Sequence, residues 1–304
     1  MKQREREKTE EDRRETAVYV PPKASYAEVL KDAVKNGYAV GQFNLNGLEY
    51  LQAIVEVAEE ERSPVILGVS VSSTKYIGLD YLIALANAAK LKARVPIILH
   101  LDHGPDFDFV MKAIRAGFDS VMYDGSEHPL EENIATTRRV VEAAHAAGVS
   151  VEGEIGRIGG TEDEVSVDER EAMLARVDEA ERFARETGID AIAPALGTAH
   201  GMYKGRPEIA FDRLEAIHKR TGLPVVLHGG SGVPEEDIRR AIALGVGKIN
   251  VNTESQVEFS RVVRKTLEEK PDLYDSRKYL GPAREAIKEI IRAKIRLFGS
   301  NNRF

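Results

Sequence analysis

Short apolar or β-branched runs alternate with amphipathic segments along the chain from Ala39 onward. The amphipathic segments space their apolar residues three and four positions apart, as at Leu51, Ile54, Val55 and Ala58, which is the pattern of a helix that packs on a sheet. This alternation predicts βα units around a parallel sheet. Eight strand-like runs are present, at residues 39–44, 65–70, 96–103, 120–125, 150–156, 191–197, 225–230 and 248–253.

Eight βα units favour a single closed (β/α)8 TIM barrel over an open doubly wound sheet. A doubly wound sheet typically carries a glycine fingerprint after its first strand, and no GxGxxG follows the run AVGQFN at 39–44. Pro234, followed by Glu235 and Glu236, predicts the start of an outer helix. A length of 304 residues with 42% hydrophobic content fits one large α/β domain.

The beginning of the chain differs in composition from the rest. Residues 2–16 (KQREREKTEEDRRET) contain no apolar side chain, so they cannot bury enough surface to offset the entropy lost on ordering. We therefore expect a charged, disordered extension over residues 1–20. The barrel, with a C-terminal helical extension, is assigned to residues 21–304.

Composition narrows the choice of partners and cofactors. A net charge of −7 without a basic, aromatic-bearing stripe speaks against nucleic acid. The sequence shows neither a membrane-length apolar run nor a signal-peptide core, so we expect a cytoplasmic protein without a membrane partner. The chain has no cysteine, so a zinc ion would have to be held by carboxylates and by some of the seven histidines.

Polar side chains fall at the carboxyl end of nearly every predicted strand, which is the active-site face of a TIM barrel. They are Asn44, Ser70, Asp102, His103, Asp124, Glu154, His200, His228, Asn250 and Asn252. His103, His200 and His228 come from three different strands, and three imidazoles with an open position are typical of a catalytic zinc site. His100 alternates with Asp102 and is interpreted as a group behind the ligands, while alternation alone does not separate the roles of Asp102 and His103. We interpret the other three histidines as solvated surface residues: His128, His145 and His218.

Two stretches that contain glycine or polar turn residues predict a phosphate site. HGGSGVPEED (228–237) follows the seventh strand and KINVNT (248–253) ends the eighth. Loops seven and eight of a TIM barrel commonly bind phosphate through backbone N–H groups and helix dipoles, although glycines also serve merely to permit tight turns. The long polar segment 156–169 after the fifth strand is either a loop that closes over substrate and carries a glutamate base, or a solvated acidic loop.

Five longer motifs stand in order along the chain: HLDHG (100–104), VEGEIGRIGGTED (151–163), GTAHGMYKG (197–205), LHGGSGVP (227–234) and KINVNTE (248–254). Together they resemble the class II fructose-bisphosphate aldolase family, which includes tagatose-bisphosphate aldolases, and the likeness runs from about Tyr38 to the C-terminus. The resemblance implies a lyase that reversibly cleaves fructose 1,6-bisphosphate into dihydroxyacetone phosphate and glyceraldehyde 3-phosphate. An enediolate stabilised by Zn²⁺ would be the intermediate.

The resemblance also implies roles for individual residues. The zinc ligands would be three histidines, joined by a carboxylate when the metal shifts: His103, His200, His228 and Glu154. Asp102 matches the acid/base that handles the C4 hydroxyl, and Glu162 matches the mobile base that moves a proton at the dihydroxyacetone phosphate carbon.

Further positions match residues that hold the substrate: Asn44, Ser70, Gly201, Lys204, Gly229, Ser231, Asn250, Asn252 and Thr253. A monovalent cation, K⁺ or Na⁺, commonly assists near the first phosphate in this family. Arg277 resembles an arginine that reaches a neighbouring subunit's site to hold the second phosphate, which implies a homodimer or homotetramer. The implied partners are thus a phosphorylated ketose and triose phosphates.

Several alternatives stay open at this point. The chain departs from many relatives at residues 71–73 and 105–106 beside the substrate, and at Gln256, where some have arginine, so tagatose 1,6-bisphosphate or a related ketose is a second candidate substrate. Asn252 favours fructose. A catalytically silent barrel that binds sugar phosphates is a third reading, against which the complete set of acid/base and ligand residues argues. A class I route through a lysine Schiff base finds no lysine in strands three to seven, and Lys248 is predicted at the start of strand eight, the wrong end.

Overall fold

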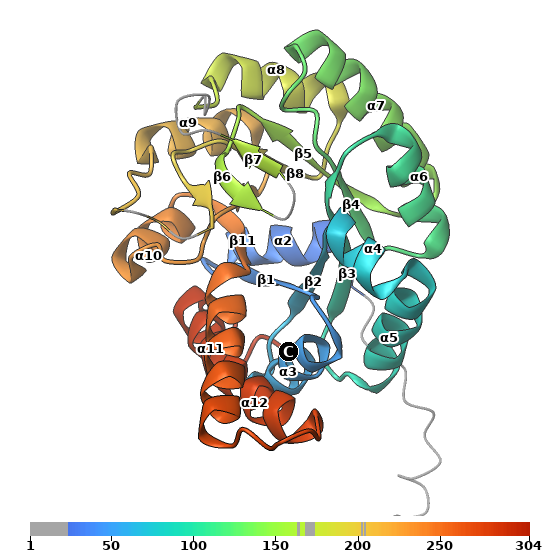
Figure 1. The fold of residues 1–304 in the computed structure, drawn as a ribbon. Coiled ribbons are helices and arrows are strands. Elements are labelled where there is room, and N and C mark those ends of the chain that lie inside the picture. Colours follow the sequence, from blue (N-terminus) through green and yellow to red (C-terminus); the bar gives the residue numbers. More distant parts are fainter. Residues whose placement is uncertain (1–23, 163–164, 168–173, 202, 204) are drawn as a thin grey trace, which may run out of the picture.

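The computed structural model describes residues 24–162, 165–167, 174–201, 203 and 205–304. Eight parallel strands form a closed barrel in the order β1-β11-β10-β8-β5-β4-β3-β2, which confirms the predicted TIM barrel (Figure 1). The barrel strands are β1 (Val40–Asn44), β2 (Val65–Val69), β3 (Ile97–Gly104), β4 (Ser120–Tyr123), β5 (Ser150–Ile155), β8 (Ala191–Pro194), β10 (Val225–Leu227) and β11 (Val246–Val251). Each overlaps one predicted run. The extension expected over residues 1–20 lies outside the described residues.

Helices surround the barrel on its outer side (Figure 1). They are α3 (Leu48–Glu61), α4 (Val71–Ile77), α5 (Leu79–Lys92), α6 (Phe107–Ala116), α7 (Leu130–Ala146), α8 (Val177–Thr187), α9 (Phe211–Thr221), α10 (Glu235–Ala243), α11 (Thr253–Glu269) and α12 (Arg277–Phe298). Pro234 directly precedes α10, and acidic residues occupy its first turn, so the helix start predicted there is confirmed. No described helix is long and apolar enough to cross a membrane.

Successive side chains of each strand face opposite sides of the barrel wall. One set, which includes Phe43 and Leu67, packs against the outer helices in the larger hydrophobic core. The other set, which includes Val40, Ile66 and Ile98, forms a smaller core inside the barrel. Because the period is two residues, the polar residues that follow these inward positions along the strands also enter the interior.

A helix that precedes the first strand, α2 (Tyr26–Lys35), covers the amino-terminal end of the barrel. In Figure 1 it lies across the opening, behind the strands. Its buried face belongs to the interior core, and the Ala27 N–H donates to Ser150 Oγ at the start of β5, over 3.3 Å. A capping box between Ser25 and Glu28 fixes its first turn. The end opposite the predicted active site is thereby closed.

A second, three-stranded sheet follows the carboxyl end of β5, where the sequence predicted only a long loop. It consists of β6 (Gly159–Glu162), β7 (Val165–Val167) and β9 (Ala199–His200), in the order β7-β6-β9. β6 runs antiparallel to β7 and parallel to β9, with Gly160 in register with His200. The strand that carries Glu162 is therefore tied to the strand that carries His200.

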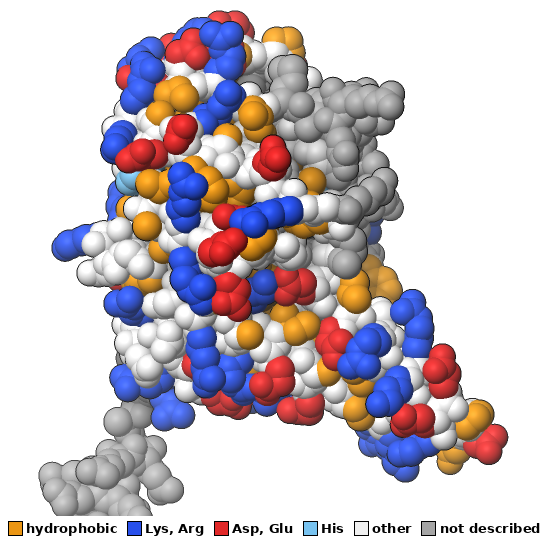
Figure 2. Space-filling model, turned by 90° about the vertical axis from the view of Figure 1, so that its left-hand side faces the viewer, with side chains coloured by type: hydrophobic (Ala, Val, Ile, Leu, Met, Phe, Trp, Pro, Cys, Tyr) orange, Lys and Arg blue, Asp and Glu red, His pale blue; other side chains and the backbone are white. Residues whose placement is uncertain are grey.

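Helices α11 and α12 confirm the predicted C-terminal helical extension. α12 packs against α3 and α11 and buries Ile287, Ile291 and Ile295. Ion pairs flank this packing, including Lys288 with Glu56 at 3.0 Å. At the height of α11 and α12, Figure 2 shows a lobe that projects at the lower right and carries charges of both signs beside apolar side chains.

Candidate active site

Three histidines meet at the carboxyl end of the barrel. His103 lies near the end of β3, His200 on β9, and His228 directly after β10. The ring centroid of His103 lies 5.2 Å from that of His200 and 4.8 Å from that of His228. One ring nitrogen of each histidine lies within 4.8 Å of the other two, so the trio could hold one metal ion. The three histidines singled out in the sequence are thus brought together.

The backbone of His103 explains why two adjacent residues serve the same site. In a regular strand, the neighbour of the inward-facing Asp102 would face outward. His103 instead has a φ of 51°, and the register between β3 and β4 shifts between Leu101 and Gly104. A left-handed non-glycine residue costs about 1–3 kcal/mol and is found mostly where surrounding structure and function require it. This local distortion turns the imidazole toward the other histidines.

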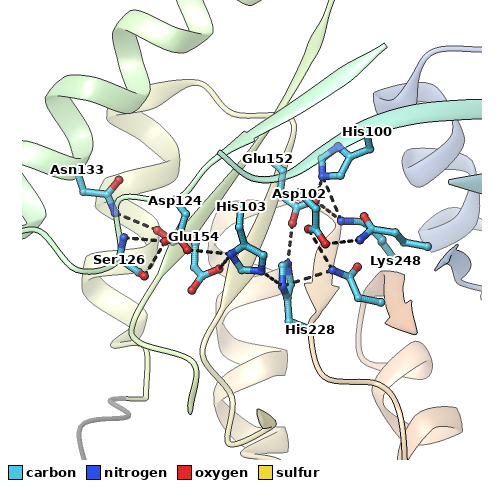
Figure 3. Close-up of polar contacts among 12 residues, drawn as sticks. His100, Asp102, His103, Asp124, Ser126, Asn133, Glu152, Glu154, His228 and Lys248 are labelled. Carbon is cyan, nitrogen blue, oxygen red and sulfur yellow. Dashed lines mark hydrogen bonds and ion pairs between the residues drawn. The ribbon is translucent and has the colours of Figure 1, made fainter. Parts of the chain in front are cut away.

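His103 is held from two sides (Figure 3). Its Nδ1 lies 2.8 Å from Asp124 Oδ2, and its Nε2 lies 3.0 Å from His228 Nδ1. Burial opposes protonation, but the hydrogen bond to Asp124 and the charges of Asp102 and Glu154 raise the pKa of His103 well above its usual range. In the chain alone the ring is therefore a cation, anchored to Asp124 through Nδ1–H, with Nε2 directed at the other histidines.

A second group of candidate ligands shares His103. The ligand atoms of His103, Asp124 and Glu154 lie within 4.8 Å of one another. Glu154 is buried on β5, and its Oε2 has no hydrogen-bond partner among the described residues. Burial and the neighbouring charge of Asp124 raise the pKa of Glu154 well above its usual range. Glu154 thus places a buried carboxyl group with a raised pKa beside the histidines, with its Oε2 3.7 Å from His103 Nδ1.

Asp102 lies inside the barrel and outside both groups of candidate ligands formed by the described residues. Gln42 Nε2 donates to its Oδ2 over 2.7 Å, and Asn250 Nδ2 lies 3.4 Å from its Oδ1. Burial raises the pKa of Asp102, but the charges of His103 and Lys248 outweigh it, so the pKa is lowered. The result is an oriented, ionised carboxylate next to the histidines.

His228 rests on a buried ion pair. Its Nε2 lies 2.9 Å from Glu152 Oε1, and Lys248 Nζ lies 2.7 Å from Glu152 Oε2, with all three side chains fully buried. The prediction that Lys248 begins its strand is wrong, because β11 starts at Val246 and the lysine side chain lies inside the barrel. Its ammonium group is enclosed and paired with a carboxylate, which leaves it unsuited to attack a substrate carbonyl.

The loops that follow β10 and β11 are joined to each other and to β9. Ser231 Oγ accepts a hydrogen bond from the Glu254 N–H over 3.4 Å. Gly229 has a φ of 65°, and a Cβ there would lie 2.3 Å from the Ala199 carbonyl oxygen, so only glycine fits. Asn252 precedes α11, which begins at Thr253. The N-terminus of α11 and the glycine-bearing turn therefore lie together, as the predicted phosphate site requires.

The other predicted site residues that the structure describes lie at strand ends, at a helix start or on the surface. Asn44 is buried at the end of β1, and Gly201, with a φ of 91°, follows β9. Ser70 caps α4 by accepting a hydrogen bond from the Ser73 N–H. Arg277, with 88% of its side chain exposed, pairs with Asp275 at 3.0 Å. Lys204 and the side chain of Glu162 lie outside the described part of the structure.

The donor set fits a zinc ion. Zn²⁺ prefers imidazole nitrogen and carboxylate oxygen in the absence of thiolates, and catalytic sites combine three protein ligands with an open position. His103, His200 and His228 supply three nitrogens, and Oε2 of Glu154, which has no hydrogen-bond partner among the described residues, supplies an alternative oxygen. Barrel and rim together are those of a metal-dependent TIM-barrel enzyme.

Four residues that shape this site were given no role in it from the sequence: Gln42, Asp124, Glu152 and Lys248. The signal for three of them was present, since each stands two positions before a polar rim residue on its strand, as Gln42 precedes Asn44. Room for Gln42 comes from Gly68 on the next strand, where a Cβ would lie 2.6 Å from Gln42 Nε2. Asp124 was noted at the rim, but nothing in the sequence paired it with His103.

Comparison with known proteins identifies the family. The family model described as "Fructose-bisphosphate aldolase class-II" matches residues 24–303. A Bacillus subtilis (strain 168) protein named "Probable fructose-bisphosphate aldolase" is 54% identical over 284 residues, which cover 92% of this chain and 99% of that protein. The fructose-bisphosphate aldolase of Staphylococcus aureus (strain Mu50) is 51% identical, with coverage of 93% and 99%. The chain belongs to the class II fructose-bisphosphate aldolase family.

Solved structures agree with this assignment. The fructose-bisphosphate aldolase (Fba) from Campylobacter jejuni superposes with a TM-score of 0.80 at 25% identity, covering 94% of this chain and 98% of that one. The YdjI aldolase from Escherichia coli K12 gives a TM-score of 0.79 at 30% identity, with coverage of 92% and 98%. The barrel and its C-terminal extension are therefore shared with solved aldolases.

The charge state of His103 predicts that metal binding releases a proton. Its pKa lies well above the usual value, so the ring is protonated at neutral pH and must lose the Nε2 proton to bind a metal. Affinity for Zn²⁺ should accordingly rise with pH until the ring is deprotonated. Calorimetric titration of EDTA-stripped protein in two buffers with different ionisation enthalpies should give different heats. Equal heats in both buffers would rule out the protonated ring.

Proposed function

We propose that the chain catalyses the reversible cleavage of fructose 1,6-bisphosphate into dihydroxyacetone phosphate and glyceraldehyde 3-phosphate, as a class II aldolase. The observation that carries the proposal is the placement of an oriented, ionised Asp102 beside three histidines that could bind one metal ion. A base next to a Lewis acid is what breaking a carbon–carbon bond between a ketone and a hydroxyl carbon requires. Family membership supports the same reaction.

His103, His200 and His228 would hold the metal, with Glu154 as an alternative ligand. When bound, Zn²⁺ supplies a Lewis acid that stabilises the negative charge developing on the ketone half of the substrate. The chain's own contribution is orientation. Asp124 fixes the ring of His103, and Glu152 fixes the ring of His228.

Asp102 accepts the proton of the C4 hydroxyl in the cleavage direction. Loss of that proton lets the C4 oxygen form the aldehyde while the C3–C4 electron pair passes to C3. Gln42 and Asn250 direct the two carboxylate oxygens, and the positive surroundings keep the group ionised. In the synthesis direction the same carboxyl group returns the proton.

Glu162 delivers a proton to the carbon that was C3, which completes dihydroxyacetone phosphate. Support comes from the backbone, because Glu162 ends β6, and β6 pairs with the strand that carries His200. A base on this strand stands at the carboxyl face of the barrel, where the ketone half would lie.

The first phosphate would bind between the turn at Gly229 and Ser231 and the N-terminus of α11, with Gly201 on the facing segment. Lys204, which lies outside the described residues, is proposed as a further contact from the family resemblance. Backbone N–H groups and the helix dipole favour an anion there. A monovalent cation, K⁺ or Na⁺, would assist at the same place. We place the enzyme in the cytoplasm, the compartment predicted from the sequence.

We place fructose ahead of tagatose bisphosphate because the family resemblance at Asn252 favours fructose. The Asn252 side chain accepts a hydrogen bond from Asn46 over 3.0 Å, which fixes its orientation. A silent sugar-phosphate-binding barrel would not need a base that is oriented by two amides and kept ionised by neighbouring positive charges, and this argues for catalysis. Arg277 would complete the site of a second copy in a homodimer or homotetramer, which agrees with its high exposure.

A coupled triose-phosphate assay with each sugar tests the substrate and the metal together. We expect cleavage of fructose 1,6-bisphosphate to exceed that of tagatose 1,6-bisphosphate. EDTA should abolish cleavage and added Zn²⁺ should restore it. Borohydride in the presence of substrate should leave the enzyme active, because Lys248 is enclosed and paired. Borohydride inactivation would instead indicate a Schiff base, and lack of cleavage of either sugar in the Zn²⁺-loaded protein would favour the silent barrel.

Asp102→Asn should reduce kcat by at least about 100- to 10,000-fold, because the amide cannot accept the C4 hydroxyl proton. Bound zinc should stay close to that of the wild type, since Asp102 belongs to neither ligand group. His200→Ala is the matched variant and should lose metal as well as activity. Loss of zinc in Asp102→Asn would transfer this residue to the ligand set.

Glu162→Ala should slow cleavage, and it should slow exchange of the carbon-bound proton of dihydroxyacetone phosphate with solvent by about 100- to 10,000-fold. Substrate should still bind, because the phosphate and metal contacts come from other strands. Asp163→Ala and Glu164→Ala serve as controls. Unchanged exchange in Glu162→Ala, with a loss in one of the controls, would move the proton transfer to that neighbour.

Mixing two inactive variants tests the proposed sharing of Arg277. In a mixed dimer of Arg277→Ala and Asp102→Asn chains, one site would contain Asp102 from the first chain and Arg277 from the second. Activity should therefore reappear on mixing, while Lys278→Ala alone should resemble the wild type. No recovery in a mixture shown to exchange subunits would mean that Arg277 does not act across an interface.

A further inference from the structure

Beneath the three histidines lies a set of fully buried polar side chains, two of which, Tyr26 and His100, the proposed reaction does not use. Tyr26, His100, Glu152 and Lys248 are each completely inaccessible to solvent. Burying hydroxyl, carboxylate and ammonium groups is costly unless all of them are paired. Stability alone does not account for these polar groups in a barrel core, because apolar side chains would fill the same space at a lower cost in free energy.

Both oxygens of Glu152 are occupied. Oε1 lies 2.9 Å from His228 Nε2. Oε2 accepts from Lys248 Nζ over 2.7 Å and also from the Tyr26 hydroxyl, while His100 Nε2 lies 3.5 Å away. Figure 3 shows Glu152 between His228 on one side and Lys248 on the other. One carboxylate thus links the floor of the barrel to a candidate metal ligand.

The contacts of His228 define which of its nitrogens carries the proton. A carboxylate can only accept, so Nε2 carries the hydrogen that points to Glu152. Nδ1 lies 3.4 Å from the Asn250 Nδ2 amide, which is a donor, and 3.0 Å from His103 Nε2. Its lone pair therefore faces the space between the histidines, as a metal ligand requires.

The Tyr26 hydroxyl is the member of this network that the barrel strands do not supply. Tyr26 is the first residue of α2, and its ring stacks on His100 with centroids 5.1 Å apart and planes 5° apart. His100 is itself fixed by a contact of 2.8 Å between its Nδ1 and Ser120 Oγ. Burial and the charge of Glu152 raise the pKa of Tyr26 well above its usual value, so the hydroxyl keeps its proton and acts as donor.

We propose that Tyr26 is a positioning residue, through which helix α2 holds Glu152 and thereby fixes the orientation and tautomer of His228 for metal binding. The inference rests on the proposed assignment of His228 as a metal ligand. A purely structural hydroxyl would contribute to folding alone. A positioning hydroxyl also changes the affinity for metal at a site that it does not touch.

The chain offers a matched control for this distinction. Tyr38 is also fully buried next to α2, and its hydroxyl donates to Asp32 Oδ2 over 2.8 Å. Among the described residues, its hydrogen bond leads only to α2, whereas that of Tyr26 leads to Glu152. Tyr26→Phe and Tyr38→Phe each remove one hydroxyl–carboxylate bond, so similar losses of thermal stability are expected from both.

The test measures metal affinity with Zn²⁺ and Co²⁺ alone, by competition against a chromophoric chelator, on full-length protein stripped with EDTA. Tyr26→Phe should bind both ions about 10-fold or more weakly than the wild type, and Tyr38→Phe should not differ from it. Glu152→Gln should lose more affinity than Tyr26→Phe. The d–d absorption spectrum of bound Co²⁺ should shift in Tyr26→Phe and Glu152→Gln but not in Tyr38→Phe.

Equal affinity and equal Co²⁺ spectra for Tyr26→Phe and Tyr38→Phe would overturn the proposal. If Tyr26→Phe cannot be purified folded, Glu152→Gln decides, and unchanged affinity in that variant would overturn it as well. His228→Ala tests the assignment of His228 as a metal ligand separately from the role of Tyr26. Wild-type affinity in His228→Ala would remove the proposed ligand assignment itself, whereas its loss beside an unaffected Tyr26→Phe would remove only the role of Tyr26.

Discussion

The ion pair between Lys248 and Glu152 is the contact on which the interior of this barrel depends. A closed barrel has one narrow interior. Removing one member of an ion pair buried there typically destabilises the fold by about 3–5 kcal/mol, because the other charge is left without a partner. Here the pair is fully buried, and it connects in two directions. Above it, Glu152 supports His228, and Lys248 adds positive charge near Asp102. Below it, Glu152 receives the Tyr26 hydroxyl of α2. Binding site and barrel floor thus share one electrostatic network.

Charged groups that compensate one another also surround the three histidines. The protonated ring of His103 lies between Asp124 and the charges of Asp102 and Glu154, and the distorted backbone at His103 is what allows this placement. A bound divalent cation would put two positive charges where the protonated His103 ring puts one. The surrounding carboxylates already neutralise positive charge at this place. The acidic side chains that would repel one another in the chain alone therefore become an advantage once a metal is present.

Much of this could be predicted from the sequence because both the fold and the rim obey simple periods. Eight apolar runs gave the barrel, and the residues at their carboxyl ends gave the histidines, Asp102 and the phosphate loops. The period of two residues could also have placed Gln42 and Glu152 inside. Other features depend on three-dimensional context. The left-handed turn at His103, the pairing of β6 with β9 and the depth of Lys248 each follow from contacts between distant segments, which local patterns do not encode.

The closure of the barrel also has a consequence for the order in which the chain is synthesised. β1 completes its pairing only with β11, with Gln42 in register with Asn250, and the Ala39 N–H donates to the Phe298 carbonyl at the end of α12 over 3.0 Å. A ribosome releases residue 40 long before residue 251, so the first strand has no second neighbour while most of the chain is made. Until β11 and α12 have been made, its edge must stay open or be covered by another protein, and α12, more than 200 residues further along the chain, is the helix that secures the first strand.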